Sequence, residues 1–157
     1  MSLLQNVDKI IGFLESSGCR YTIIGGIAVL LHGGRASTID FDLYVMADDF
    51  NKIETHLLAN GCATEIKSPH QMRMRFNGIQ VDILEADPIT TESIFKRSIR
   101  RVIVTAECNV ATPEDLIILK TIADRPIDRR DIAELREIFA SSLDELYISD
   151  TLQKLRS

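Results

Sequence analysis

The sequence has little of several residue types that mark particular classes of protein. Tryptophan is absent and aromatic residues make up 6% of the 157 residues, so the chain does not indicate a stacking platform for single-stranded nucleic acid. The three cysteines and three histidines form no CxxC or Cys/His pattern, which argues against a zinc site and a disulfide framework. Free thiols in a reducing compartment are the simpler interpretation.

Long apolar segments and strong positive charge are also lacking. No apolar run reaches the roughly 18 residues of a membrane span, and residues 1–5 carry no basic stretch that leads into an apolar run. We therefore expect a cytoplasmic protein with no membrane partner. The net charge of −5 argues against a protein that coats duplex DNA.

One local basic patch stands against this acidic background. It consists of Lys96, Arg97, Arg100 and Arg101. Such a patch keeps an RNA substrate open, although a solvated helix end and strand start explain it more simply.

The length and the content of 45% hydrophobic and 26% charged residues are typical of one ordinary globular domain. Hydrophobic periodicity predicts helices over 3–16, 27–31, 47–60, 90–98, 112–124, from 128 and over 142–155, and strands over 21–24, 38–45, 71–76, 79–84 and 101–105. We expect a single α+β domain over 1–157. A mixed or antiparallel sheet backed by helices should occupy about 1–110, and a short helical C-terminal part about 112–157.

The strongest local signal is a hairpin around Asn-Gly at 77–78. This dipeptide between two alternating runs favours a two-residue type I′ turn. The register then sets Phe76 opposite Ile79 on the apolar face and Arg73 opposite Asp82 on the polar face.

Three aspartates form a candidate metal site. Asp40 and Asp42 are two residues apart on an expected strand, so both point to the same face. Asp82 joins them if the hairpin pairs beside that strand. Hard oxygen ligands suit Mg²⁺ or Mn²⁺, and converging carboxylates can hold the two ions of a phosphoryl-transfer site. The alternatives are that Asp40 and Asp42 merely face water and that Asp82 only forms an ion pair with Arg73.

A glycine pair lies between the first strand and the next helix. Gly25 and Gly26 would leave bare backbone N–H groups at a helix start, where phosphates bind readily. An ordinary turn explains the pair equally well when it is taken alone.

Taken together, these features resemble a known family. The segment GGIAVLLHGGRASTIDFDLYV resembles the signature of DNA polymerase β-type nucleotidyltransferases, and most of all the small AbiEii-like proteins of type IV toxin–antitoxin systems. The matching positions are Gly25, Gly26, His32, Gly33, Arg35, Thr38, Asp40, Asp42 and Leu43. A second segment, TPEDLIILKTIADRPIDRRDI, is similar to the stretch in which that group carries a helical lysine followed by Arg-x-x-Asp; here these are Lys120, Arg125 and Asp128, with Asp131 after them.

The resemblance implies an enzyme that moves a nucleoside monophosphate from an NTP to a hydroxyl on RNA, protein or a small molecule. It implies Asp40, Asp42 and Asp82 as catalytic metal ligands, with Mg²⁺ or Mn²⁺ as cofactor. It also implies nucleotide contacts from Gly25, Gly26, Arg35, Thr38 and Lys120. The alternative is a catalytically silent nucleotide-binding module or a toxin–antitoxin partner protein on the same fold, and an oligomer is possible in either case.

Simpler roles compete for several of these residues. Lys120 borders the apolar stripe of its helix and could snorkel to solvent or point inward to a phosphate. Asp128 and Asp131 fit an N-cap and an acid one turn later. His32 fits a helix end or the core better than a base.

Overall fold

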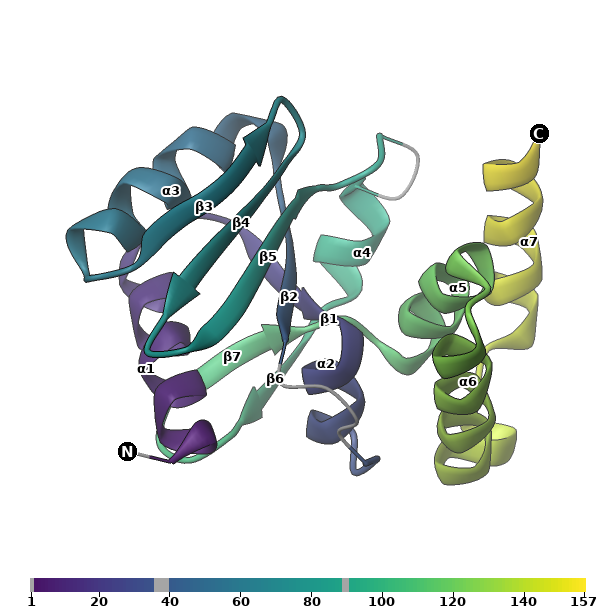
Figure 1. Cartoon of the computed structure of the whole chain (residues 1–157). Coiled ribbons are helices and arrows are strands. Elements are labelled where there is room, and N and C mark those ends of the chain that lie inside the picture. Colours follow the sequence, from purple (N-terminus) through teal and green to yellow (C-terminus); the bar gives the residue numbers. More distant parts are fainter. Residues whose placement is uncertain (1, 36–39, 89–90) are drawn as a thin grey trace.

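The computed structural model describes residues 2–35, 40–88 and 91–157, and its centre is a mixed β-sheet (Figure 1). In these residues the strands are β1 (Tyr21–Ile24), β2 (Phe41–Val45), β3 (Ala63–Ser68), β4 (Gln71–Phe76), β5 (Ile79–Glu85), β6 (Ile99–Val102) and β7 (Glu107–Val110). They form one sheet in the order β3-β4-β5-β2-β1-β7-β6. The β2·β5 and β1·β7 pairs are parallel and the others antiparallel.

Helices cover this sheet and extend beyond it. In the same residues they are α1 (Leu3–Ser16), α2 (Gly25–Leu31), α3 (Phe50–Ala59), α4 (Thr91–Arg97), α5 (Pro113–Ala123), α6 (Pro126–Phe139) and α7 (Glu145–Arg156). Helices α5, α6 and α7 gather at one side of the molecule, away from α1 and α3 (Figure 1). The expected α+β class is therefore confirmed. None of the described helices is long and apolar enough to cross a membrane.

The two faces of the central strands differ in what they carry. Alternation along β2 buries Phe41, Leu43 and Val45 completely, and these residues belong to the same core as α1 and α3. Asp42 and Tyr44 occupy the opposite face. The strand pattern thus separates a dry core from a polar face.

The Asn-Gly hairpin forms with the expected register. Phe76 pairs with Ile79 and Arg73 with Asp82, while Asn77 and Gly78 both have positive φ, as a type I′ turn requires. The hairpin strand β5 then pairs in parallel with β2. This second pairing brings Asp82 beside Asp42.

The structure differs from the expected elements at the sheet edges. Strand β3 was not expected, because only one of its six residues is partly covered and its sequence lacks alternation. In place of the single strand expected at 101–105, the chain forms a hairpin of β6 and β7, and residues 103–105 lie in its turn. Asp8 on α1 holds the turn of this hairpin by accepting hydrogen bonds from the backbone N–H groups of Thr105 and Ala106.

The start of α6 is also earlier than expected. The helix begins at Pro126 with Arg125 as the N-cap, because proline suits the first helical turn. Asp128 is therefore not the N-cap but the third helical residue, and it accepts a hydrogen bond from the Arg125 backbone N–H.

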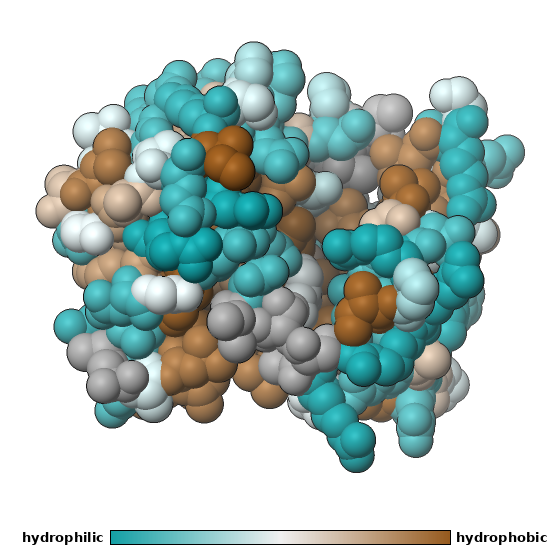
Figure 2. Space-filling model, viewed as in Figure 1, coloured by the Kyte–Doolittle hydropathy of each residue, from teal (hydrophilic) through white to brown (hydrophobic). Residues whose placement is uncertain are grey.

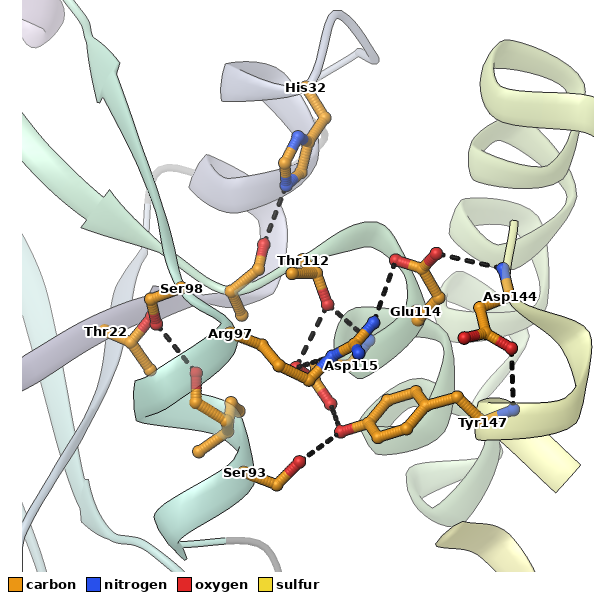
Figure 3. A network of polar contacts seen from close by, with 12 residues as sticks. Thr22, His32, Ser93, Arg97, Ser98, Thr112, Glu114, Asp115, Asp144 and Tyr147 are labelled. Carbon is orange, nitrogen blue, oxygen red and sulfur yellow. Dashed lines mark hydrogen bonds and ion pairs between the residues drawn. The ribbon is translucent and has the colours of Figure 1, made fainter. Parts of the chain in front are cut away.

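A polar network ties the C-terminal helices to the sheet (Figure 3). Asp115 on α5 accepts a hydrogen bond from the Tyr147 hydroxyl of α7, which also contacts Ser93 of α4. The Arg97 guanidinium of α4 lies 3.8 Å from the centre of the Tyr147 ring and 3.8 Å from Asp115 Oδ2. Burial and the bond to Asp115 raise the pKa of Tyr147 to about 12. The network fixes α4, α5 and α7 at one junction.

His32 is the buried C-cap residue of α2, as the simpler interpretation predicted. It is 7% exposed, and its Nε2 lies 2.7 Å from the Ala111 carbonyl oxygen in the connection from β7 to α5. Its ring meets Phe139 edge-on. Burial lowers the pKa of His32, so the neutral imidazole is the folded form.

Acid should therefore unfold the protein partly through His32. The unfolded imidazole takes up a proton below a pH of about 6.5, whereas the folded one resists it, so the free energy of unfolding falls as pH drops below that value. We expect His32→Gln, whose amide can still donate to Ala111, to lose less stability than the wild type between pH 8 and pH 5 in urea unfolding. His56→Gln, at a surface histidine bonded to Ser16, should behave like the wild type.

Candidate functional site

The site is built on one transverse row of the sheet. Asp42 on β2 has Ile24 of β1 as its partner on one side and Asp82 of β5 on the other. Arg73 of β4 stands next in the row, opposite Asp82. Partners in register share a face. The carboxylates of Asp42 and Asp82 and the guanidinium of Arg73 therefore lie side by side on the polar face of the sheet.

Gly25 makes room for the Asp42 carboxylate. A Cβ atom at this position would overlap Asp42 Oδ2 and lie 3.1 Å from its Cβ and Cγ, and Gly25 has φ +71. Both the space and the backbone conformation therefore require glycine. The glycine turn has a role that the phosphate hypothesis did not include, since it lets the first turn of α2 touch the carboxylate.

Asp42 is held in an environment that disfavours its charge. Burial, the nearby Asp82 and Asp40 charges and a hydrogen bond with Asp82 raise the pKa of Asp42 to about 7, against a weaker opposite effect of Lys120. Two carboxylates that cannot both ionise freely share a proton or a cation. Such a pair fits a divalent cation, which prefers carboxylate oxygens.

Asp40 lies in the electrostatic surroundings of this pair. Its charge acts on Asp42 and on Arg73. Within the described residues, no three acidic, histidine or cysteine side chains form a ready metal-binding group. The structure thus brings Asp42 and Asp82 together, and the convergence of all three carboxylates stays a prediction.

The carboxylate pair opens into a cleft of about 520 Å³ between the sheet and the C-terminal helices. The space-filling view shows a hollow between these two parts, with apolar residues visible inside it (Figure 2). On the sheet side the described lining residues are Ile24, Gly25, Asp42, Tyr44, Gln71, Arg73, Asp82, Leu84 and Asp87. On the helix side they are Leu116, Leu119, Lys120, Ile122, Ala123, Arg125, Asp128 and Leu155.

The helix side of the cleft carries two cationic side chains, Lys120 and Arg125, and each is bonded to a buried aspartate of α6. Lys120 is 6% exposed, and its Nζ lies 2.9 Å from Asp131 Oδ2 and 3.6 Å from Asp128 Oδ1. Arg125 donates to Asp128 through Nε at 2.6 Å and Nη2 at 3.1 Å. Although burial acts the other way, these bonds lower the pKa of Asp128. Lys120 therefore points inward and does not snorkel.

The other expected nucleotide contacts are placed differently. Gly26 is buried behind Gly25 and does not line the cleft. Arg35 lies outside the cleft, in a separate depression along α6, where its backbone N–H donates to Glu134. Thr38 lies outside the described residues.

Sequence reasoning did not identify every residue of the cleft. Tyr44 lines it from β2, which its place two residues after Asp42 on the same face could have indicated. Leu155 reaches it from α7, and no local sequence signal indicates this contact.

Two residues of the expected basic patch are engaged in contacts within the fold. Arg97 is part of the Tyr147 network, and Arg100 is bonded to Glu15 of α1. The simpler interpretation of the patch as part of the fold therefore accounts for two of its four members.

Comparison with known proteins identifies the family. A family model described as "Nucleotidyl transferase of unknown function (DUF2204)" matches residues 3–156, and the chain belongs to this family. No curated protein sequence matches the chain.

Solved structures share the fold at low sequence identity. One is ANT(2″)-Ia in complex with adenylyl-2″-tobramycin, with a TM-score of 0.69, 18% identity, and coverage of 98% of this chain and 96% of that one. The lincosamide antibiotic adenylyltransferase LnuA, bound to lincomycin, has a TM-score of 0.61 and 18% identity, with coverage of 85% of this chain and 96% of that one. An antigenic nucleotidyltransferase-like protein from Paracoccidioides brasiliensis has a TM-score of 0.61 and 20% identity, with coverage of 98% of this chain and 86% of that one. At these identities the similarity shows the fold.

The requirement for glycine at position 25 can be tested with a matched control. Gly18 has φ +72 but nothing within 4 Å of an added Cβ, whereas Gly25 has φ +71 and the Asp42 carboxylate in the way. We expect Gly18→Ala to cost about 1 kcal/mol of unfolding free energy from backbone strain alone, and Gly25→Ala to cost clearly more. Equal losses in urea unfolding would show that Asp42 does not press on this turn.

Neutralising Asp42 should stabilise the metal-free protein. Because its pKa rises from an ordinary 3.8 to about 7 on folding, the folded state binds more protons than the unfolded state in this range. The free energy of unfolding therefore falls as pH rises from about 4 to about 7. We expect Asp42→Asn to be more stable than the wild type by about 4 kcal/mol at pH 8 in EDTA, and to lose this pH dependence.

The measurement is urea unfolding of both proteins between pH 4.5 and pH 8. Asp150→Asn, at an exposed position of α7, is the control and should follow the wild type. A variant at Asp42 that is no more stable at pH 8 would contradict the strained carboxylate pair.

Proposed function

We propose that this nucleotidyltransferase family member transfers a nucleoside monophosphate from an NTP to a hydroxyl acceptor in the cleft between the sheet and α5–α7. The observation that carries the proposal is the half-buried pair of Asp42 and Asp82, with the pKa of Asp42 raised to about 7. A pair in which charge is disfavoured without a cation is typical of a site that binds one.

The carboxylates Asp40, Asp42 and Asp82 would hold Mg²⁺ or Mn²⁺. When bound, these ions neutralise the triphosphate and activate the attacking hydroxyl. The cradle at Gly25 supports this assignment, because it leaves Asp42 Oδ2 uncovered by any side chain from α2. The chemistry of the donors supports it too, since adjacent carboxylates are hard oxygen ligands.

The nucleotide would lie between the metal-binding row and the cations of α5 and α6. Lys120, and beside it Arg125, faces the cleft opposite Asp42 and suits the phosphates that leave as pyrophosphate. We assign the backbone at Gly25, which lines the cleft, to the same phosphates; for Gly26 the sequence motif alone supports such a contact. Arg35 and Thr38 remain nucleotide contacts on the strength of the sequence motif alone.

For the acceptor we favour a small molecule over RNA or protein. The three cations that line the cleft in the described residues are each paired with a carboxylate, Arg73 with Asp82, Lys120 with Asp131 and Arg125 with Asp128. An extended phosphate backbone would need cations in excess. Two proteins of similar fold are antibiotic adenylyltransferases with small acceptors. The likeness to AbiEii-type toxins rests on the sequence motif.

Metal-dependent nucleotide binding tests the proposal first. Binding of each NTP is measured by calorimetry with and without Mg²⁺ or Mn²⁺. We expect at least one NTP to bind only when the metal is present. Asp42→Ala should weaken this binding by about tenfold or more, an effect of at least about 1.4 kcal/mol. Asp150→Asn should not change it. Unchanged nucleotide binding in Asp42→Ala would reject the metal site.

Group transfer is the second test. NTPs labelled in the α-phosphate are incubated with the protein and with small-molecule, RNA and protein fractions of a cell lysate. We expect label in the small-molecule fraction from the wild type and none from Asp42→Ala. Nucleotide binding without transfer to any fraction would instead support the silent nucleotide-binding module.

A further inference from the structure

We propose that Arg73 acts through Asp82 as the built-in counter-charge of the carboxylate row and thereby limits how tightly the site takes a divalent cation. The inference rests on the proposed function, because it concerns the same metal site.

Asp82 accepts hydrogen bonds from two side chains other than Asp42. Arg73 Nε donates to Asp82 Oδ1 at 2.9 Å, and Gln80 Nε2 donates to Oδ2 at 2.8 Å. Arg73 is on β4, on the side of β5 away from Asp42, and Gln80 is on β5 itself. A carboxylate has about four lone-pair sites, so both oxygens keep acceptor capacity toward Asp42.

The charge of Arg73 also balances the row. Its hydrogen bond and its attraction to Asp82 raise the pKa of Arg73, with further contributions from Glu65 and Asp40. A guanidinium stays charged at every relevant pH. In the metal-free protein Arg73 therefore supplies positive charge next to two carboxylates, where a divalent cation would otherwise be the natural partner.

Removing Arg73 therefore has two expected consequences, one for metal binding and one for the metal-free protein. Removing Arg73 takes a positive charge from the neighbourhood of the cation, which strengthens metal binding. It also removes a counter-ion from the metal-free protein, which lowers its stability. A residue that merely joined β4 to β5 would lower stability without strengthening metal binding.

Arg75 provides a matched control on the same strand. It is two residues from Arg73, so it shares its face, and it also forms an ion pair, with Glu65 at 2.8 Å. It is not among the residues that line the cleft. Arg75→Gln therefore removes an arginine ion pair on the same face and leaves the hydrogen bond of Arg73 to Asp82 in place, with only a smaller electrostatic effect on Asp40 and Asp82.

The test uses Mn²⁺ alone, followed by electron paramagnetic resonance of the free ion, together with urea unfolding in EDTA. We expect Arg73→Gln to bind Mn²⁺ about tenfold more tightly than Arg75→Gln, as a Coulomb interaction of one charge with a dication through solvent predicts. We expect it to be less stable than Arg75→Gln without metal. Arg73→Lys keeps the charge and should bind Mn²⁺ like the wild type.

The outcomes separate this inference from the proposed function. If the wild type binds no Mn²⁺, the proposed metal site fails and this inference fails with it. If the wild type binds Mn²⁺ but Arg73→Gln binds it no more tightly than Arg75→Gln, only the inference is overturned. Weaker Mn²⁺ binding in Arg73→Gln, together with lower stability, would also overturn the inference. Arg73 would then only join β4 to β5.

Discussion

Repulsion between Asp42 and Asp82 is the constraint on which the rest of the site depends. The parallel register of β2 and β5 sets these carboxylates next to each other, and burial makes the charge on Asp42 costly. The neighbouring residues relieve this cost: Gly25 yields space and Arg73 supplies a counter-charge. An arrangement that costs stability in the free protein is expected where a ligand compensates for it.

The C-terminal helices give this strained row its opposite wall. Lys120 and Arg125 face it from α5 and the α5–α6 corner, each held by a buried aspartate. The network of Asp115, Tyr147 and Arg97 fixes that wall to α4 and thereby to the sheet. Each cation that lines the cleft in the described residues is already paired with a carboxylate, so the proposed metal ions would bring in the further positive charge for a nucleotide. The fold and the proposed cofactor are thus parts of one charge balance.

Local patterns predicted the features that depend on neighbours in sequence. The Asn-Gly turn determined the pairing of Arg73 with Asp82, and alternation along β2 placed Asp42 off the core. The edge strand β3 was missed because its exposed residues lack a periodic signal. The pairing of β5 with β2 and the contact of Leu155 with the cleft depend on long-range packing, so no local pattern could establish them. The role of Gly25 follows from the pairing of β1 with β2, which sets Ile24 opposite Asp42 and brings Gly25 against its carboxylate.

The spacing of the second motif can now be understood in physical terms. Asp128 and Asp131 are one turn apart on α6, so both face the same side of the helix, and that side meets Lys120 on α5. A buried lysine needs counter-charges, and Asp131 supplements Asp128, which lies near both Lys120 and Arg125. Asp131 takes the lysine and Asp128 bonds the arginine while it completes the start of α6. Asp128, which is the third helical residue and not the expected N-cap, therefore serves both the start of α6 and the charge balance of the cleft.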